Sequence, residues 1–160
     1  MTNPYHPHNH RHCIEDALQE ARSLCKDKGA RLTPLREKVL ELVWQSHSPI
    51  GAYDILAELG RLEERSAQPP TVYRALDFLM EHGLIHRLSS LNAFIGCSHP
   101  SEQHNSCFLI CEKCHVAQEI EHPSIDASLK DCAQSQGFKI IDSSIELTGL
   151  CPNCVGANQE

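Results

Sequence analysis

The chain has 160 residues, of which 41% are apolar and 22% charged, a globular composition that excludes a large multidomain enzyme and a disordered chain. No apolar run approaches the ~20 residues of a membrane span. Residues 1–12 lack the apolar core of a signal peptide, so we expect a cytoplasmic protein with no membrane partner. The net charge of −7 is uneven, because residues 1–88 hold 11 Lys/Arg and 12 Asp/Glu whereas residues 89–160 hold 3 and 9. This asymmetry predicts two parts, of which only the first tolerates a polyanion.

The N-terminal residues 1–12 are rich in histidine, proline and asparagine. We expect a disordered arm there, either a solvated tail or a weak metal-collecting tract. Its histidines are His6, His8, His10 and His12. From Cys13 to Cys25 the apolar residues recur with a helical period, which indicates that both thiols are buried structural groups.

Further helices and a hairpin follow this first helix. Thr33-Pro34 is a helix start, with a hydroxyl N-cap and proline at the first helical position. Another helix is predicted over residues 70–81, after a short helix and a polar stretch. The period becomes strand-like at residues 84–88 and 93–97, which predicts a hairpin. Helices followed by a two-stranded wing predict a winged helix-turn-helix over residues 13–97, with the last helix in the major groove of DNA.

Residues 98–160 have a different pattern. Short strands are predicted at 108–110, 116–120 and 139–147, with a helix over 123–135. This αβ unit has few aromatic residues and little core, so it needs a metal ion or a partner subunit to be stable. The predicted fold class is therefore α+β, a winged helix followed by a small αβ domain.

The strongest motif is a pair of Cys-x-x-Cys sequences separated by 36 residues. The four thiols are Cys111, Cys114, Cys151 and Cys154. Two such pairs supply four thiolates to a tetrahedral zinc ion, with no position left for a substrate. A structural zinc site is the favoured interpretation; a redox dithiol switch or two disulfides are the alternatives.

A second set of metal-binding residue types is crowded into 37 positions between the two predicted domains. Its members are His86, Cys97, His99, His104, Cys107, His115, Glu119 and His122. A thiolate beside imidazoles and a carboxylate favours zinc over iron or manganese. Spacing alone does not select four ligands from this set.

Together, the winged helix, the His/Cys-rich junction and the paired cysteine motifs resemble the ferric uptake regulator (Fur) family of bacterial metal-sensing repressors, and within it the zinc branch. The segments that carry the resemblance are Arg31-Leu-Thr-Pro34, Ala52-Tyr-Asp54 and Pro70-Thr-Val-Tyr-Arg-Ala-Leu76. The resemblance covers about residues 13–155. It implies an αβ dimerisation domain over residues 98–160 and a homodimer.

The resemblance also implies two zinc ions per monomer, one structural and one regulatory. The structural ion takes Cys111, Cys114, Cys151 and Cys154. The regulatory ion takes His86, Cys97, His104 and Glu119. The iron branch usually carries a His-His-Asp-His run where this chain has His99-Pro-Ser-Glu-Gln-His104, a departure that weakens an iron-sensing or peroxide-sensing assignment. This departure leaves His99, Cys107 and His122 as possible extra ligands.

The resemblance implies that Tyr53 and Arg74 contact DNA. We add Thr71 and Tyr73, from the same predicted helix as Arg74, as further candidates for DNA contacts. The expected function is a zinc-responsive repressor that binds near-palindromic operator DNA as a dimer and represses zinc-uptake genes, without enzymatic activity or a small-molecule substrate. The alternatives are a sibling regulator that senses iron, manganese or peroxide, a zinc enzyme, and a zinc-buffering protein.

Overall fold

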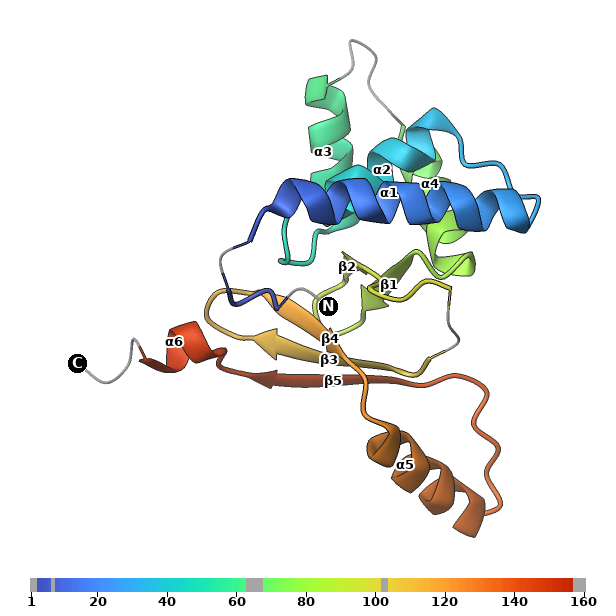
Figure 1. The fold of residues 1–160 in the computed structure, drawn as a ribbon, viewed down its shortest axis with the longest axis vertical. Helices are drawn as coiled ribbons and strands as arrows, with labels where there is room; N and C mark the ends of the chain where they lie inside the picture. Colours follow the sequence, from blue (N-terminus) through green and yellow to red (C-terminus); the bar gives the residue numbers. More distant parts are fainter. Residues whose placement is uncertain (1–2, 7, 63–67, 102–103, 157–160) are drawn as a thin grey trace.

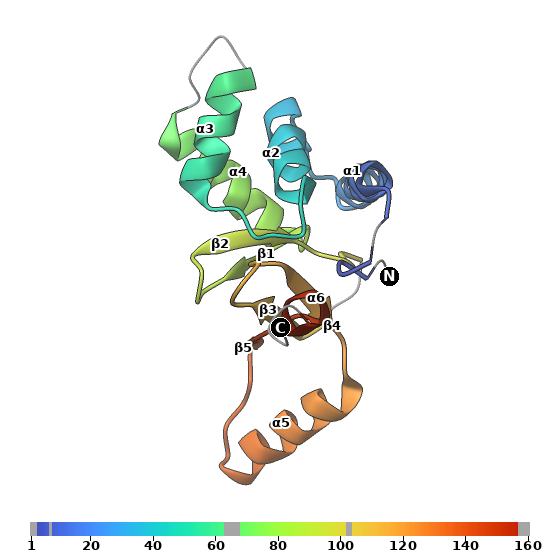
Figure 2. The ribbon, with the colours of Figure 1, turned by 90° about the vertical axis from the view of Figure 1, so that its left-hand side faces the viewer.

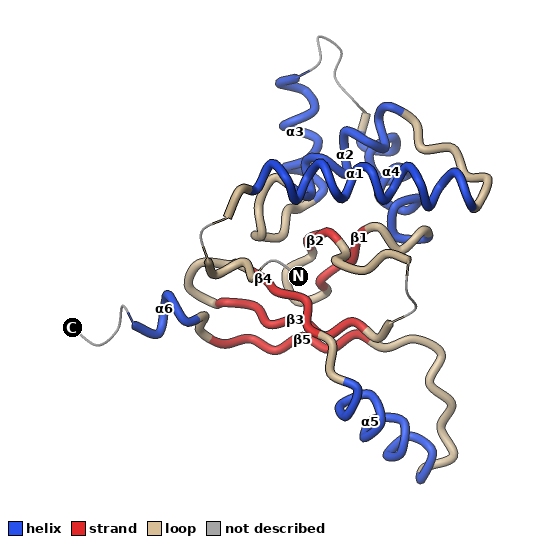
Figure 3. Tube along the Cα trace, in the orientation of Figure 1, coloured by secondary structure: helices blue, strands red, loops and turns tan. Residues whose placement is uncertain are grey.

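The computed structural model describes residues 3–6, 8–62, 68–101 and 104–156 (Figure 1). The first half consists of α1 (His10–Asp27), α2 (Pro34–Trp44), α3 (Ala52–Leu62), α4 (Pro69–Glu81), β1 (Ile85–Leu88) and β2 (Ala93–Gly96). The second half consists of β3 (Ser106–Cys111), β4 (Ala117–Ile120), α5 (Pro123–Ser135), β5 (Ser144–Gly149) and α6 (Pro152–Gly156). The fold is α+β, with the first four helices gathered on one side of the strands (Figure 3).

Capping residues and a glycine set where helices of the first half begin and end. At the start of α2, Thr33 Oγ1 accepts a hydrogen bond from the Arg36 N–H, and Pro34 occupies the first turn. At the end of α4, Gly83 has a φ of 69°, the left-handed conformation that glycine adopts at little cost. The chain then turns directly into β1.

One apolar cluster joins α1 to α4 with the hairpin. Its fully buried members include Val39, Leu40, Ile55, Leu76 and Leu79. The hairpin pairs β1 with β2 in antiparallel register, Ile85 opposite Gly96. This is the winged helix-turn-helix that the apolar periods predicted, with α4 as its last helix.

The second half is built on a three-stranded sheet in the order β4-β3-β5. The β3–β4 pair is antiparallel and the β3–β5 pair is parallel. Helix α5 provides the crossover between β4 and β5 and extends away from the sheet (Figure 2). None of the side chains of α5 is buried.

The two halves are packed against each other. A second apolar cluster combines Leu88 and Ile95 of the hairpin with Phe108, Ile110 and Ala117 of the sheet. The backbone N–H groups of Ser89 and Ser90 donate to the Glu146 carboxylate of β5 at 2.6 and 3.0 Å. The hairpin therefore packs both against the helices of the first half and against the sheet of the second half.

The structure differs most from the predicted elements at the starts of α1 and β5. Helix α1 begins at His10 and not at Cys13, because the Asn9 side chain caps it by accepting from the Arg11 N–H at 3.2 Å. Strand β5 spans Ser144–Gly149, whereas a strand was predicted over 139–147. Its start is set by its pairing partner, since β3 itself begins at Ser106, opposite Ser144. Within the described residues, no helix has the length and apolar character that crossing a membrane requires.

Candidate metal centres and DNA-facing helices

The four residues His86, Cys97, His104 and Glu119 converge at the boundary between the two halves. Their ligand atoms all lie within 4.8 Å of one another. His86 is on β1 and Cys97 directly follows β2, whereas His104 precedes β3 and Glu119 is on β4. The backbone thus brings two ligands from each half to one point, which we name the junction site.

The Glu119 carboxylate lies at the centre of the junction site. Its Oε1 lies 2.7 Å from His104 Nε2 and 3.0 Å from His86 Nε2. Its Oε2 accepts from the Ser98 N–H at 3.0 Å. Burial opposes ionisation of Glu119, but the two histidines and the Ser98 N–H outweigh it and lower its pKa to about 2. Glu119, only 6% exposed, therefore offers an ionised carboxylate to a cation at neutral pH.

The surroundings of Cys97 and His86 also favour a metal ion at the junction site. Cys97 Sγ lies 3.6 Å from His104 Nε2. Burial, and secondarily the charge of Glu119, raise the pKa of the Cys97 thiol to about 12. The ring Nε2 of His86 is buried with no hydrogen bond of good geometry, while its Nδ1 lies 3.2 Å from Ser106 Oγ. One thiol, two imidazoles and a carboxylate are a set of four donors of the kind that zinc binds.

The paired cysteine motifs form the second candidate centre, the four-cysteine site. The ligand atoms of Cys111, Cys114, Cys151 and Cys154 lie within 4.8 Å of one another. The backbone N–H groups of Cys114 and Cys151 lower the pKa of Cys111 to about 6, whereas its neighbour Cys151 raises the pKa of Cys154 to about 12. Four thiols this close favour a cation that lets all of them ionise. The parallel pairing of β3 with β5 places Cys111 opposite Gly149, which explains how 36 intervening residues return the second pair to the first.

Three possible extra ligands lie outside both centres. His99 pairs with Glu121 at 3.1 Å. Cys107 is buried in β3, opposite Ile120. His122 precedes α5, with its Nδ1 2.6 Å from Ser124 Oγ. None of these three belongs to a cluster of metal-binding groups among the described residues.

The candidate DNA contacts are all exposed residues of α3 and α4. Tyr53 of α3 is 76% exposed and Tyr73 of α4 is 45% exposed. Thr71 and Arg74 are exposed on α4. No ion pair within the described residues involves Arg74. Tyr53 is far more exposed than a packing residue, which favours a contact outside the chain.

A third group of metal-binding residues was not predicted. His8, His10, Cys13 and His47 place their ligand atoms within 4.8 Å of one another. The histidine-rich arm was a signal for this cluster, but His47 lies 34 positions beyond Cys13. The periodicity of the first helix pointed to Cys13 as a structural thiol and gave no reason to join it to His47.

Comparison with known proteins fits this geometry. The model of the ferric uptake regulator family matches residues 27–148. The chain belongs to the ferric uptake regulator family. Members of this family are transcription regulators, so the chain is a regulator and not an enzyme. It is 38% identical over 143 residues to the zinc uptake regulation protein of Escherichia coli (strain K12), covering 88% of this chain and 82% of that one.

Solved structures of the family also match the arrangement of the two halves. The zinc uptake regulator complexed with zinc and DNA has a TM-score of 0.85 at 36% identity, covering 90% of this chain and 96% of that chain. Holo XcZur has a TM-score of 0.79 at 41% identity, covering 87% and 96%. Apo XcZur has only 0.54 at 39% identity, covering 89% and 97%. Because the identities are nearly equal, the difference in TM-score reflects conformation, and this chain is arranged like the holo form.

Proposed function

We propose that the protein is a zinc-responsive transcriptional repressor that binds operator DNA as a homodimer and represses zinc-uptake genes. The observation that carries the proposal is the junction site, to which each half of the chain contributes two ligands. Because such a repressor acts on intracellular DNA, we infer a cytoplasmic location. The similarity to the zinc uptake regulation protein supports zinc as the metal that is sensed.

The assignment of the ligands follows from the donor chemistry. We assign the regulatory zinc to His86, Cys97, His104 and Glu119, and the structural zinc to the four cysteines. These four residues would hold the ion with two ligands from each half. Four protein ligands would leave no open coordination position for catalysis.

The junction site controls how the winged helix is oriented. His86 and Cys97 are rigidly attached to the hairpin, whereas Glu119 belongs to the central sheet. Ligands held at one point fix the angle between hairpin and sheet, which favours the conformation that fits DNA. Linkage then requires DNA to tighten zinc binding by the same factor; a 100-fold coupling corresponds to about 2.7 kcal/mol.

The DNA contacts are assigned to the exposed surface of α3 and α4. Arg74 can form a bidentate contact with guanine, worth about 1–3 kcal/mol of base discrimination. Tyr53 can reach a phosphate or a thymine methyl group, and Thr71 and Tyr73 precede Arg74 in the first turns of α4. The second half holds 3 Lys/Arg against 9 Asp/Glu, so it faces away from the DNA. Affinity should fall steeply with salt because phosphate contacts release counterions.

The homodimer is supported by apolar surface in the second half. Ile141 is 95% exposed, Phe138 68% and Leu147 48%. These residues lie on β5 and on the segment that leads to it from α5. Covering them with a second copy would remove apolar surface from water. Two winged helices related by a two-fold axis then predict a near-palindromic operator.

The experiment that tests the proposal is the substitution Cys97→Ser, with Cys132→Ser as the matched control. Cys132 is an exposed thiol of α5 outside all three clusters. DNA recovered by in vitro selection with the zinc-loaded protein serves as the probe, and affinity is measured by fluorescence anisotropy at buffered free zinc. We expect Cys97→Ser to keep the dimer and the zinc ion of the four-cysteine site but to lose zinc-dependent binding to DNA. Unchanged zinc response in Cys97→Ser would refute the assignment.

A further inference from the structure

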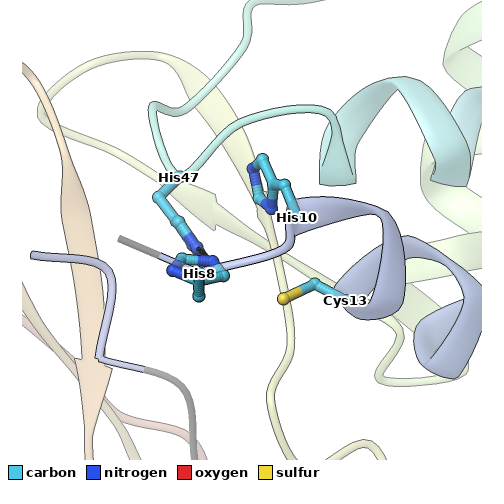
Figure 4. Close-up of side chains that lie close together, drawn as sticks. All are labelled: His8, His10, Cys13 and His47. Carbon is cyan, nitrogen blue, oxygen red and sulfur yellow. Dashed lines mark hydrogen bonds between the residues drawn. The ribbon is translucent and has the colours of Figure 1, made fainter. Parts of the chain in front are cut away.

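The third group of ligands, His8, His10, Cys13 and His47, forms a compact cluster that the junction and four-cysteine sites do not use (Figure 4). His10 and Cys13 are three positions apart on the first turn of α1, so their side chains share one helix face. His8 precedes the helix, and His47 reaches the group from the loop between α2 and α3 (Figure 4). The cluster thus joins the N-terminal arm to the body of the first half.

The histidine rings of the cluster lie in close contact with one another. His8 Nε2 and His47 Nε2 face each other at 2.9 Å, and the His10 and His47 rings are stacked with centroids 4.5 Å apart. Both ring nitrogens of His10 are buried without a hydrogen-bond partner. Leaving a buried polar group unsatisfied costs about 1–3 kcal/mol. A solvated tail or simple ring stacking explains neither the convergence nor the two orphaned nitrogens.

We propose that His8, His10, Cys13 and His47 form a third zinc site. Three imidazole nitrogens and one thiolate make a four-membered donor set of the kind that binds zinc tetrahedrally. The mixture of a soft thiolate and imidazoles disfavours magnesium, calcium and manganese, which prefer oxygen. Zinc binding displaces the thiol proton of Cys13 to solvent and gives the orphaned His10 ring a partner.

The position of this site gives it a second role, as a tie between the two halves. The His47 carbonyl accepts from the Ala117 N–H of β4 at 3.0 Å. At the other end of the arm, Tyr5 packs against the four-cysteine site, and its carbonyl accepts from Asn153 Nδ2 at 3.1 Å. Zinc in the third site would therefore hold an arm that is already anchored to the second half. This role rests on the proposed function, whereas the existence of the site does not.

The first test counts zinc ions per protomer by native mass spectrometry of the full chain, after saturation with zinc and removal of the excess. We expect three ions in the wild type and two in both His8→Ala/His10→Ala and His47→Ala. The matched control is His6→Ala/His12→Ala, which removes two exposed histidines of the same arm outside the cluster and should keep three. Two ions in the wild type would overturn the third site, even if DNA binding still responds to zinc.

The control also separates a built site from a loose histidine tract. If His6→Ala/His12→Ala loses as much zinc as His8→Ala/His10→Ala, the arm collects metal without a defined site and the proposal fails. A second readout is trypsin cleavage after Arg11, an exposed residue of α1. Zinc should slow this cleavage several-fold in the wild type and not in His47→Ala, whose arm sequence is intact. Equal protection in both would contradict the proposal.

Discussion

His86 of the hairpin and Glu119 of the central sheet lie 3.0 Å apart, Nε2 to Oε1, although they come from different halves of the chain. Glu119 is the buried ligand, with its side chain 3% exposed, while His86 is 19% exposed. A contact of this kind forms only when the hairpin and the sheet adopt one relative orientation. Under the proposed function, the junction site therefore responds to the angle between the halves as well as to the metal.

Glu119→Gln should weaken zinc binding at the junction site. The amide keeps the size of the side chain but removes the charge that attracts the cation. We expect at least about a 10-fold loss of affinity, since even residues that only support a ligand cost 10–100-fold when replaced. Competition with a zinc-binding dye measures this. Glu121→Gln, two residues away and exposed, is the control and should change the affinity little.

Zinc affinity at the junction site should rise with pH. The pKa of the Cys97 thiol is raised to about 12, so the metal-free site binds a proton that zinc must displace. Glu119, with a pKa lowered to about 2, is already ionised near neutral pH and does not make the zinc affinity depend on pH there. One displaced proton predicts about a 10-fold gain in affinity per pH unit above neutrality. Titrations at two pH values measure it, and a slope that persists in Cys97→Ser would show that another group is responsible.

Gly96→Ala should destabilise the protein. A β-carbon at Gly96 would overlap the Trp44 indole at the end of α2, and Cys97 is the next residue. Forcing an extra methyl group into a packed region typically costs about 1–3 kcal/mol. Chemical denaturation at a fixed free zinc concentration measures the loss.

The control for Gly96 is Gly60→Ala in α3. A β-carbon there meets nothing within 4 Å. Alanine is favoured over glycine inside a helix by roughly 0.5–1 kcal/mol, so this variant should be slightly more stable than the wild type. Equal effects of the two substitutions would show that the Trp44 contact does not constrain Gly96.

Arg74→Ala should weaken operator binding and leave zinc binding unchanged. We expect a loss of about 1–3 kcal/mol that is largest for the base pair Arg74 reads. Lys130→Ala removes one positive charge from α5 in the second half and is the control. A loss that is the same for every DNA sequence would assign Arg74 to a phosphate contact.

Much of the architecture could be predicted from local sequence signals. The Thr33-Pro34 start marks the beginning of α2, and the strand-like periods at 84–88 and 93–97 closely match β1 and β2. These signals act over a few residues, through capping and through the burial of one face. They required no knowledge of which segments meet in space.

The metal centres could be predicted from the sequence only in part. The spacing of Cys111 and Cys114 indicated a chelating turn, but eight candidates at the junction could not be reduced to four without the resemblance. His99 and His104 are five residues apart, yet only His104 reaches the junction site. The cluster at His47 depends on the packing of the arm against the loop after α2, a long-range contact that no local period encodes.

The most direct test of the account is a titration of operator affinity in the wild-type full chain at buffered free zinc, with iron(II) and manganese(II) in parallel. The account predicts that DNA affinity rises by about 100-fold as zinc fills the junction site, and that the other two ions act only at far higher free concentrations. Affinity that does not change with zinc, or that responds to iron or manganese instead, would contradict it.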